Sequence, residues 1–354
     1  MSKKVMLGMS GGVDSSAAAL LLIEQGYSVC GATMLLTPDS SQDSVDCIDA
    51  AEVCKRLGIE HRIIDLRERF RQSVIEDFAR QYRRGKTPNP CIVCNREIKF
   101  GAMYDIAMES GFDYIATGHY AKILTDEKGE PSVYRGDSGK DQSYVLWMLT
   151  SEKLRHILLP IGGYEKEDLR ALAATAGLEI SRKKDSQDIC FIPDKDYKGF
   201  LYSNFTDFGR KGYFKDTKGN ILGSHGGIEN FTVGQRKGLG ISLSRPMYVV
   251  RIENDDVVLG EEGSQYNRYI LCSGINLISG GGDTEFSAQV KYRYASALAN
   301  ARVKITGDRA VVCFDERQRA LTPGQSAVFY DGSKLLGGGI IEAAADSEDD
   351  LPIN

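Results

Sequence analysis

The chain of 354 residues lacks any long apolar run, and only four of its residues are histidine. No segment approaches the ~20 consecutive apolar residues that cross a bilayer, and the N-terminus carries no signal-peptide pattern. Internal repeats and low-complexity linkers are missing, and His61, His156 and His225 have no metal-ligand spacing. These absences argue against a membrane protein, a repeat fold and a histidine metal site. We expect a cytoplasmic protein with no membrane partner.

An excess of positive charge is also absent, because the net charge is −5. This balance argues against a protein that coats nucleic acid nonspecifically, and we expect no DNA partner. RNA stays open as a substrate, since basic residues gather locally in 81–100 and 205–240. The alternative for both stretches is an ordinary solvated surface.

The segment Ser10–Ser16, with the sequence SGGVDSS, follows the apolar run Val5–Met9 and opens the apolar segment Ala17–Ile23. A strand that ends at a Ser-Gly-Gly turn and continues as a helix presents free backbone N–H groups to an anion. The lysine of the phosphate loop of kinases and GTPases is missing. The segment instead resembles the SGGxDS loop of enzymes that split ATP into AMP and pyrophosphate. Asp14 would repel a bare phosphate, which indicates a bridging Mg²⁺; the alternative is an ordinary tight turn.

Strand and helix patterns alternate over the first third of the chain. Strands are expected at 5–9, 29–34, 62–66 and 113–117, and helices up to 25 and at 44–57, 78–84 and 96–110. This rhythm predicts an α/β fold with a doubly wound parallel sheet, whose ligands bind at the carboxyl ends of the strands. The segment Ser10–Ser16, Met34 and Gly118 all follow such ends, so we expect a nucleotide site there.

The pattern changes beyond about residue 150. Residues 165–176 are helical, 208–245 are rich in glycine, tyrosine and charge, and 270–341 contain short strands separated by turn signals. The last spacing predicts a small antiparallel barrel. We therefore expect a pyrophosphate-loop domain in 1–200, a small mixed central domain in 201–265 and a C-terminal antiparallel β-barrel in 266–354.

The second strong feature is the segment 87–95, TPNPCIVCN. Its two prolines predict a stiff, extended loop. The two-residue gap lets the sulfurs of Cys91 and Cys94 face one point, which suits a metal, an iron–sulfur cluster or a redox pair. The basic neighbours Arg96 and Lys99 favour thiolates, and Cys190 is a third candidate. The other cysteines lie in apolar or helical settings typical of buried thiols; they are Cys30, Cys47, Cys54, Cys272 and Cys313.

Taken together, the motifs resemble the bacterial tRNA-specific 2-thiouridylases over essentially the whole chain. They follow the family's order: SGGVDSS at 10–16, TPNPCIVCN at 87–95, GHY at 118–120, KDQSY at 140–144, DSQDICF at 185–191 and FTVGQRKGLG at 231–240. Members of that family use ATP to adenylate O2 of the wobble uridine in certain tRNAs, and they then replace this oxygen with sulfur.

The resemblance implies a tRNA-uridine 2-sulfurtransferase that uses ATP and Mg²⁺. Cys94 corresponds to the nucleophile and Cys190 to the carrier of a persulfide, supplied by a sulfur-carrier protein or a sulfide donor. The residues implied to hold ATP are Gly8, Met9, Ser10, Gly11, Gly12, Val13, Asp14, Ser15, Met34 and Gly118. The central domain is implied to contact the tRNA, together with Asn89, Pro90, Cys91, His119, Lys140, Asp141, Gln142, Arg293, Tyr294 and Gln325.

The chain departs from the family at Cys91, where many members have an aspartate proposed as the general acid/base. Cys91, Cys94 and Cys190 supply three thiolates, enough to hold a [4Fe–4S] cluster with one open iron. Such a cluster competes with a route through a persulfide and a Cys94–Cys190 disulfide.

Two other functions are open to the sequence. A different pyrophosphate-loop enzyme, such as an amidating synthetase or a lysidine-type tRNA ligase, would have no use for the paired and distal cysteines. A non-catalytic RNA-binding or sulfur-relay protein would not need the intact loop with Asp14.

Overall fold

The first part of the chain forms a five-stranded parallel sheet of order β3-β2-β1-β4-β7. In the computed structural model the described residues are 2–178, 189–192 and 194–352. The strands are β1 (Lys4–Gly8), β2 (Ser28–Leu35), β3 (Glu60–Asp65), β4 (Tyr114–Ala116) and β7 (Ile157–Leu158). Val5, Met6 and Leu7 of the central strand β1 are fully buried, as expected for a parallel strand covered on both faces.

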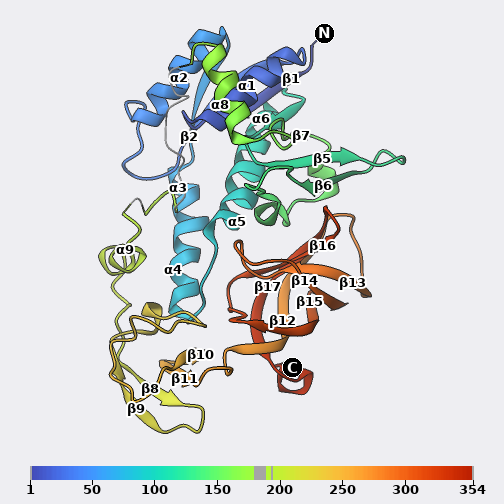
Figure 1. Ribbon diagram of the computed structural model, residues 1–354. Helices are drawn as coiled ribbons and strands as arrows, with labels where there is room; N and C mark the ends of the chain where they lie inside the picture. Colours follow the sequence, from blue (N-terminus) through green and yellow to red (C-terminus); the bar gives the residue numbers. More distant parts are fainter. Residues whose placement is uncertain (1, 179–188, 193, 353–354) are drawn as a thin grey trace.

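Helices cover both faces of this sheet (Figure 1). On one face α1 (Val13–Glu24), α2 (Val45–Leu57) and α8 (Lys166–Thr175) share a core with Val5 and Leu7. Met6 points to the other face, where it joins a second core, because successive side chains of a strand alternate. The predicted doubly wound sheet is confirmed.

Two long helical segments leave the sheet. The first comprises α3 (Arg67–Phe70), the π-helical turn η1 (Arg71–Ile75) and α4 (Glu76–Arg83). The second comprises α5 (Pro90–Cys94), the π-helical turn η2 (Asn95–Ala102) and α6 (Met103–Glu109). The helices predicted at 78–84 and 96–110 are therefore parts of longer segments.

The prediction of an extended loop over the whole of 87–95 is wrong, because α5 begins at Pro90. Asn89 Oδ1 accepts a hydrogen bond from the backbone N–H of Cys91 at 3.1 Å. Asn89 thus caps the helix, and Pro90 occupies its first position, where a missing N–H leaves no helical bond unmade. Both cysteines of the pair consequently lie on the first turns of a helix.

A small mixed sheet of order β10-β11-β8-β9 follows α9 (Tyr197–Asn204). Its strands are β8 (Gly212–Asp216), β9 (Ile221–His225), β10 (Tyr248–Glu253) and β11 (Asp256–Gly260), and the short helix η5 (Ile228–Asn230) follows β9. β11 runs parallel to β8, whereas the other pairs are antiparallel. Phe214, Phe231 and Val249 belong to its separate core, and the predicted mixed central domain is confirmed.

The C-terminal strands form the predicted antiparallel barrel. They are β12 (Tyr266–Leu277), β13 (Thr284–Lys291), β14 (Ala299–Thr306), β15 (Arg309–Arg319), β16 (Ser326–Asp331) and β17 (Lys334–Ala345), followed by the turn η6 (Glu348–Asp350). β12 pairs with both β15 and β17, which closes the ring.

A hairpin that the sequence analysis did not predict, β5 (Ala121–Thr125) and β6 (Pro131–Arg135), extends the barrel sheet at β17. The short helices η3 (Ser143–Leu146) and α7 (Ser151–Leu154) then lead back to the parallel sheet. A segment expected in the first domain therefore shares a sheet with the third, and the exact boundaries at 200 and 265 stay a prediction.

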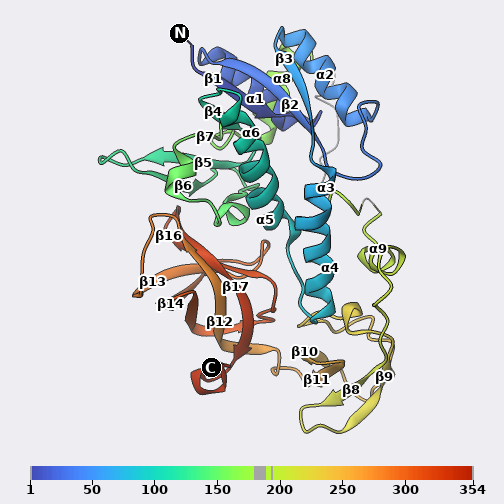
Figure 2. The same ribbon diagram turned by 180° about the vertical axis from the view of Figure 1, so that it is seen from behind.

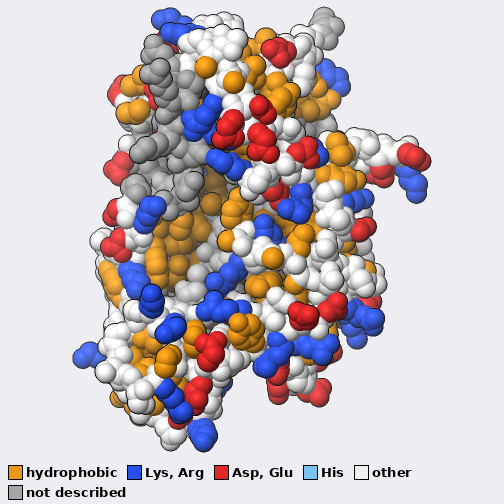
Figure 3. Space-filling view, viewed as in Figure 1, with side chains coloured by type: hydrophobic (Ala, Val, Ile, Leu, Met, Phe, Trp, Pro, Cys, Tyr) orange, Lys and Arg blue, Asp and Glu red, His pale blue; other side chains and the backbone are white. Residues whose placement is uncertain are grey.

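The parallel sheet lies at one end of the molecule and the central sheet at the other, with α4 running between them (Figures 1 and 2). In the view of Figure 3 the surface is hollowed beside α4, hydrophobic side chains line the hollow, and Lys and Arg side chains gather around it. Among the described residues, none of the helices has the length and apolar character needed to cross a bilayer.

Candidate active site

The loop between β1 and α1 is closely surrounded by other backbone segments. Gly11 has a φ of +62°, and a Cβ there would lie 2.6 Å from the backbone oxygen of Asp46. A Cβ on Gly118, just beyond β4, would lie 3.0 Å from the backbone carbon of Asp14. Glycine is required at both positions, because any side chain would push neighbouring backbone away from the loop.

The structure brings the residues expected to hold ATP to one edge of the parallel sheet. Gly8 to Ser15 cover the end of β1 and the start of α1, Met34 lies near the end of β2, and Gly118 follows β4. These three strands are neighbours in the sheet. The hydroxyls of Ser15 and Ser16 donate to Gly12 O at 3.1 and 2.9 Å, so they hold the first turn of α1 rather than standing free.

The carboxylate of Asp14 has two close partners that the sequence analysis missed. Its Oδ1 accepts hydrogen bonds from Tyr120 Oη and from Lys166 Nζ, both at 2.6 Å. Lys166 supplies a positive charge at the place where the sequence had indicated a bridging Mg²⁺. Asp14 alone therefore no longer requires a metal ion, and Mg²⁺ stays a prediction.

The cysteines lie on α5 and on the turn at Ile189–Ile192, and both segments contribute buried residues to one core, among them Cys94 and Phe191. Cys91 and Cys190 are exposed, whereas Cys94 is buried. Phe191 is buried against Phe70 and Phe78, with ring centroids 5.7 and 5.5 Å apart. This aromatic packing fixes the turn that carries Cys190. The first four residues of the DSQDICF motif lie outside the described residues.

Desolvation favours the neutral form of all three thiols, because protein atoms crowd Cys91 and Cys190 even though these two side chains reach the surface. Desolvation by the surrounding protein raises the pKa of Cys91 and of Cys190, and it raises the pKa of Cys94 to about 12. The positive charge of Lys99 opposes the shift at all three thiols. The expectation that basic neighbours favour thiolates is therefore wrong, because desolvation raises each pKa more than Lys99 lowers it. The second basic neighbour, Arg96, forms an ion pair with Glu97.

The three thiols do not fit a metal centre in this conformation. Within the described ranges, no group of three or more His, Cys, Asp or Glu side chains is placed to hold a metal ion. The eight cysteines, all in the described part of the chain, are free thiols. A [4Fe–4S] cluster on Cys91, Cys94 and Cys190 would require these side chains to approach one another, and it stays a prediction.

Several residues expected to contact tRNA are bonded within the protein. His119 is buried, its Nδ1 lies 2.7 Å from Thr117 Oγ1, and burial holds its pKa well below the usual range. The Asp141 carboxylate accepts hydrogen bonds from the backbone N–H groups of Gly136 and Ser143. Gln142 Oε1 accepts from the backbone N–H of Tyr120 at 2.9 Å.

Two further residues of this group, Arg293 and Tyr294, join the barrel to the rest of the chain. Arg293 donates to Val233 O at 3.0 Å, and burial lowers its pKa. The hydroxyl of Tyr294 donates to Asp141 O at 3.2 Å, although the residue is 42% exposed. Lys140 lies at the surface. The structure thus brings Asp141 and Tyr294 together, and contact with tRNA stays a prediction for the whole group.

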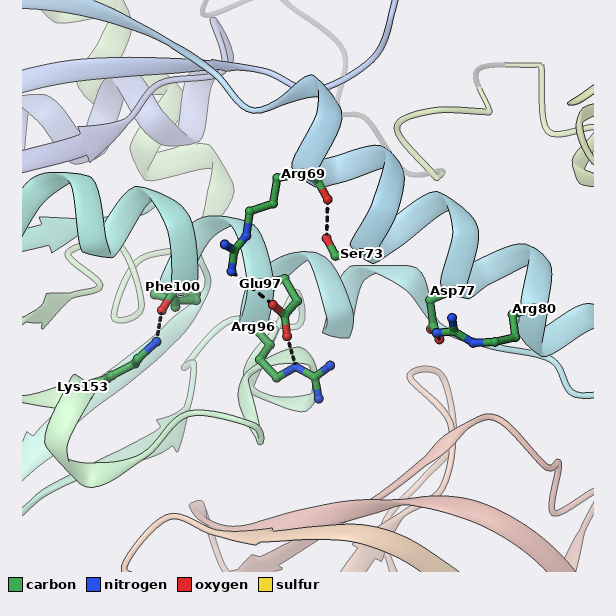
Figure 4. Close-up of polar contacts among 8 residues, drawn as sticks. All are labelled: Arg69, Ser73, Asp77, Arg80, Arg96, Glu97, Phe100 and Lys153. Atoms are coloured by element: carbon green, nitrogen blue, oxygen red, sulfur yellow. Dashed lines mark hydrogen bonds and ion pairs between the residues drawn. The ribbon is translucent and has the colours of Figure 1, made fainter.

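Carboxylates neutralise part of the positive charge near the cysteines of α5. Glu97 lies between two arginines, with Arg96 Nε at 2.8 Å and Arg69 Nη2 at 3.4 Å from its oxygens (Figure 4). Arg83 pairs with Asp207. Two arginines against one carboxylate leave one positive charge beside α5, and contact of the basic stretch 81–100 with RNA stays a prediction.

Comparison with known proteins identifies the family. A family model described as the tRNA methyl transferase HUP domain matches residues 3–194, one described as the tRNA methyl transferase PRC-barrel domain matches 198–260, and one described as the aminomethyltransferase beta-barrel domain matches 267–341. These ranges follow the three parts of the fold described above.

Curated relatives are similar along nearly their whole length. The tRNA-specific 2-thiouridylase MnmA of Acetivibrio thermocellus is 48% identical to this chain, with 96% of this chain and 99% of the relative covered. MnmA 1 of Clostridium tetani is 46% identical, with 98% and 99% covered. MnmA of Clostridioides difficile is 45% identical, with 97% and 99% covered. With this identity over such coverage, the chain belongs to the tRNA-specific 2-thiouridylase family.

Proposed function

We propose that the protein is a tRNA-uridine 2-sulfurtransferase, which uses ATP to replace O2 of the wobble uridine with sulfur. Membership of the family supports tRNA thiolation, and the pyrophosphate-loop fold supports the use of ATP. The proposal includes Mg²⁺, an adenylated uridine, sulfur delivery through cysteines and a sulfur-carrier protein or sulfide donor as partner. It places the reaction in the cytoplasm.

The observation that supports a single site for both half-reactions is the position of the segment Gly118–Tyr120. Gly118 lies against the backbone of Asp14, and Tyr120 donates to the Asp14 carboxylate. Between them, the His119 ring lies 5.8 Å from that of Phe100 on the helical segment that carries the cysteines. Gly118 and Tyr120 therefore contact the nucleotide loop, and His119 between them contacts the helical segment that carries the cysteines.

The first half-reaction activates the uridine oxygen. Backbone N–H groups at the start of α1 bind the phosphates, and uridine O2 attacks the α-phosphorus while pyrophosphate leaves. Mg²⁺, when bound, stabilises negative charge on the phosphates. A uracil carbonyl oxygen is a poor leaving group, whereas the adenylated oxygen departs as AMP.

The second half-reaction delivers sulfur. The terminal sulfur of a Cys190 persulfide attacks C2, the bond between C2 and O2 breaks, and AMP leaves. Cys94 then loses its proton to solvent and attacks Cys190 Sγ, which breaks the sulfur–sulfur bond and leaves the electron pair on the 2-thio group. A Cys94–Cys190 disulfide forms, and a thiol reductant must restore both thiols before the next turnover.

The target base must leave its stack to reach C2. Asn89, Pro90 and Cys91 are the residues proposed to lie against it, and the cap that Asn89 provides holds this turn in place before the base arrives. Cys91 takes the position at which many family members have aspartate, so the acid/base role of that aspartate is vacant or reassigned in this chain.

The experiment is thiolation of unmodified tRNA with ATP and Mg²⁺ under strict anaerobiosis, before and after iron–sulfur reconstitution. We expect iron-free protein to form 2-thiouridine from a persulfide donor. Product that forms from sulfide only after reconstitution would assign the three cysteines to a cluster instead. Absence of product and of ATP-dependent pyrophosphate release under both conditions would overturn the proposed function.

A further inference from the structure

Lys166 is buried beside the nucleotide loop although it comes from a distant part of the chain. Its side chain is 5% exposed, and its ammonium forms an ion pair with Asp14, whose side chain is 34% exposed. The two residues are 152 positions apart. A lysine is rarely buried unless it is paired, so a carboxylate partner explains why this charge can remain in the interior.

Packing of α8 against α1 fixes the position of the ammonium. Lys166 is the first residue of α8, and Leu169 and Ala173 of this helix are buried in the same core as Ala18 and Leu22 of α1. Both partners of the ion pair therefore begin helices that are packed together. The pair is held by the fold and does not depend on a flexible surface side chain.

The loop itself contains a negative charge and no positive one. Asp14 lies in the first turn of α1, among the backbone N–H groups that would receive phosphate oxygens. An unpaired carboxylate there would repel a triphosphate strongly, because the interaction of two charges increases as water is excluded. With Lys166 in place, the formal charges of the two side chains sum to zero.

We propose that Lys166 is the counter-charge of Asp14 and thereby makes the loop able to accept ATP. It is a positioning residue that acts through Asp14, and this role rests on the proposed use of ATP. The loop has no lysine of its own, so from the sequence alone only a metal ion could neutralise the charge of Asp14. In the structure Lys166 of α8 neutralises it. Tyr120 holds the same carboxylate oxygen from a third segment.

The test compares ATP affinity in the presence of Mg²⁺, by equilibrium dialysis, for the full-length wild type and the variants Lys166→Met, Asp14→Asn and Asp14→Asn/Lys166→Met. We expect Lys166→Met to weaken ATP binding by about tenfold or more, since it leaves the carboxylate uncompensated. The double variant restores a neutral pair and is expected to regain most of the affinity of the wild type. Lys122→Met is the matched control, because Lys122 pairs with Asp137 on the β5–β6 hairpin.

If the role of Lys166 were merely structural, Lys166→Met would lower the stability of the protein, and the double variant would not recover the ATP affinity. ATP binding by the double variant that is as weak as in Lys166→Met would overturn the inference, since Lys166 would then act on the nucleotide directly. Unchanged affinity in Lys166→Met would also overturn it. If Lys166→Met does not fold, Lys166→Gln takes its place, because it removes the charge and keeps a donor for the Asp14 carboxylate. A wild type that binds no ATP would overturn the proposed function and, with it, this inference.

Discussion

The side-chain amide of Gln325 donates a hydrogen bond from Nε2 to the backbone oxygen of Thr87, at 2.7 Å. The backbone N–H of Thr87 donates to Pro323 O at 2.9 Å, and its hydroxyl lies 3.1 Å from that of Thr232. Thr87 is thus held by the barrel and by the central domain, two residues before Asn89 caps the cysteine helix. The barrel thereby fixes the point at which α5 begins.

We expect Gln325→Ala to lower the free energy of unfolding by about 1 kcal/mol, the usual net value of one hydrogen bond. The variant should also thiolate tRNA more slowly, because the segment before the cysteines loses an anchor. Urea denaturation and single-turnover thiolation measure the two effects. An unchanged stability together with a large loss of tRNA affinity would instead assign Gln325 to direct tRNA contact.

Asp14→Asn should reduce ATP-dependent pyrophosphate release by about 100-fold while tRNA binding stays unchanged. The reason is that the carboxylate would hold the Mg²⁺ of the proposed reaction beside the phosphates, and such a cation contributes on this scale in the transition state. Asparagine keeps an oxygen that can accept from Tyr120 Oη and from Lys166 Nζ, so these contacts can persist while the negative charge is lost. Thiolation by this variant at the rate of the wild type would show that Asp14 has no catalytic role.

Cys94→Ser and Cys190→Ser should each abolish 2-thiouridine formation and retain pyrophosphate release with tRNA present. Serine can neither carry a persulfide nor resolve one, whereas the nucleotide loop is untouched. Cys272→Ser, in the barrel core, is the control for loss of a thiol as such. An amidating synthetase or a lysidine-type ligase would stay fully active in both variants, which separates these functions from thiolation.

The reaction of Cys94 with iodoacetamide should depend on pH differently from that of a free thiol. Its pKa is raised to about 12 by burial, against about 8.5 for an ordinary cysteine. The rate should therefore still increase above about pH 9, and peptide mass spectrometry measures it residue by residue. Lys99→Met should slow the reaction further, because Lys99 lowers this pKa.

The same shift has a defined sign for stability. The folded state favours the neutral thiol, so its contribution is complete below the unfolded pKa of about 8.5 and is lost as the pH rises through about 12. For the iodoacetamide experiment, a rate of reaction of Cys94 that stops increasing at or below about pH 8.5 would contradict the prediction, because it would show that Cys94 is not desolvated in solution.

Cys91→Asp restores the residue that many members of the family have at this position. We expect the variant to keep most of its thiolation rate with a persulfide donor, since Cys91 takes no sulfur in the proposed sequence. Cys91→Ala is the matched variant without an acid/base group. Loss of both iron and activity from reconstituted Cys91→Asp would favour the cluster.

Local patterns in the sequence determined the parallel sheet, the loop at Ser10–Ser16 and the barrel. These patterns act over only a few residues, so they can be recognised without the rest of the chain. Examples are the apolar run of β1 and the glycines that end α1 and α2, Gly26 and Gly58, with φ of +84° and +66°. The cysteine pair was also visible, because its spacing alone brings two sulfurs together. The helix that carries it was missed, since the two prolines outweighed the cap signal of Asn89 followed by proline.

Only the tertiary structure decided which groups face the site and in what state. Tyr120 and Lys166 reach Asp14 from 106 and 152 residues away, and no local pattern marks such partners. The raised pKa values of the thiols depend on how many protein atoms replace water around them, which packing sets. Gln325 and Arg293 were assigned from the family alone, whereas their hydrogen bonds to Thr87 and Val233 arise from how the barrel packs against the other domains.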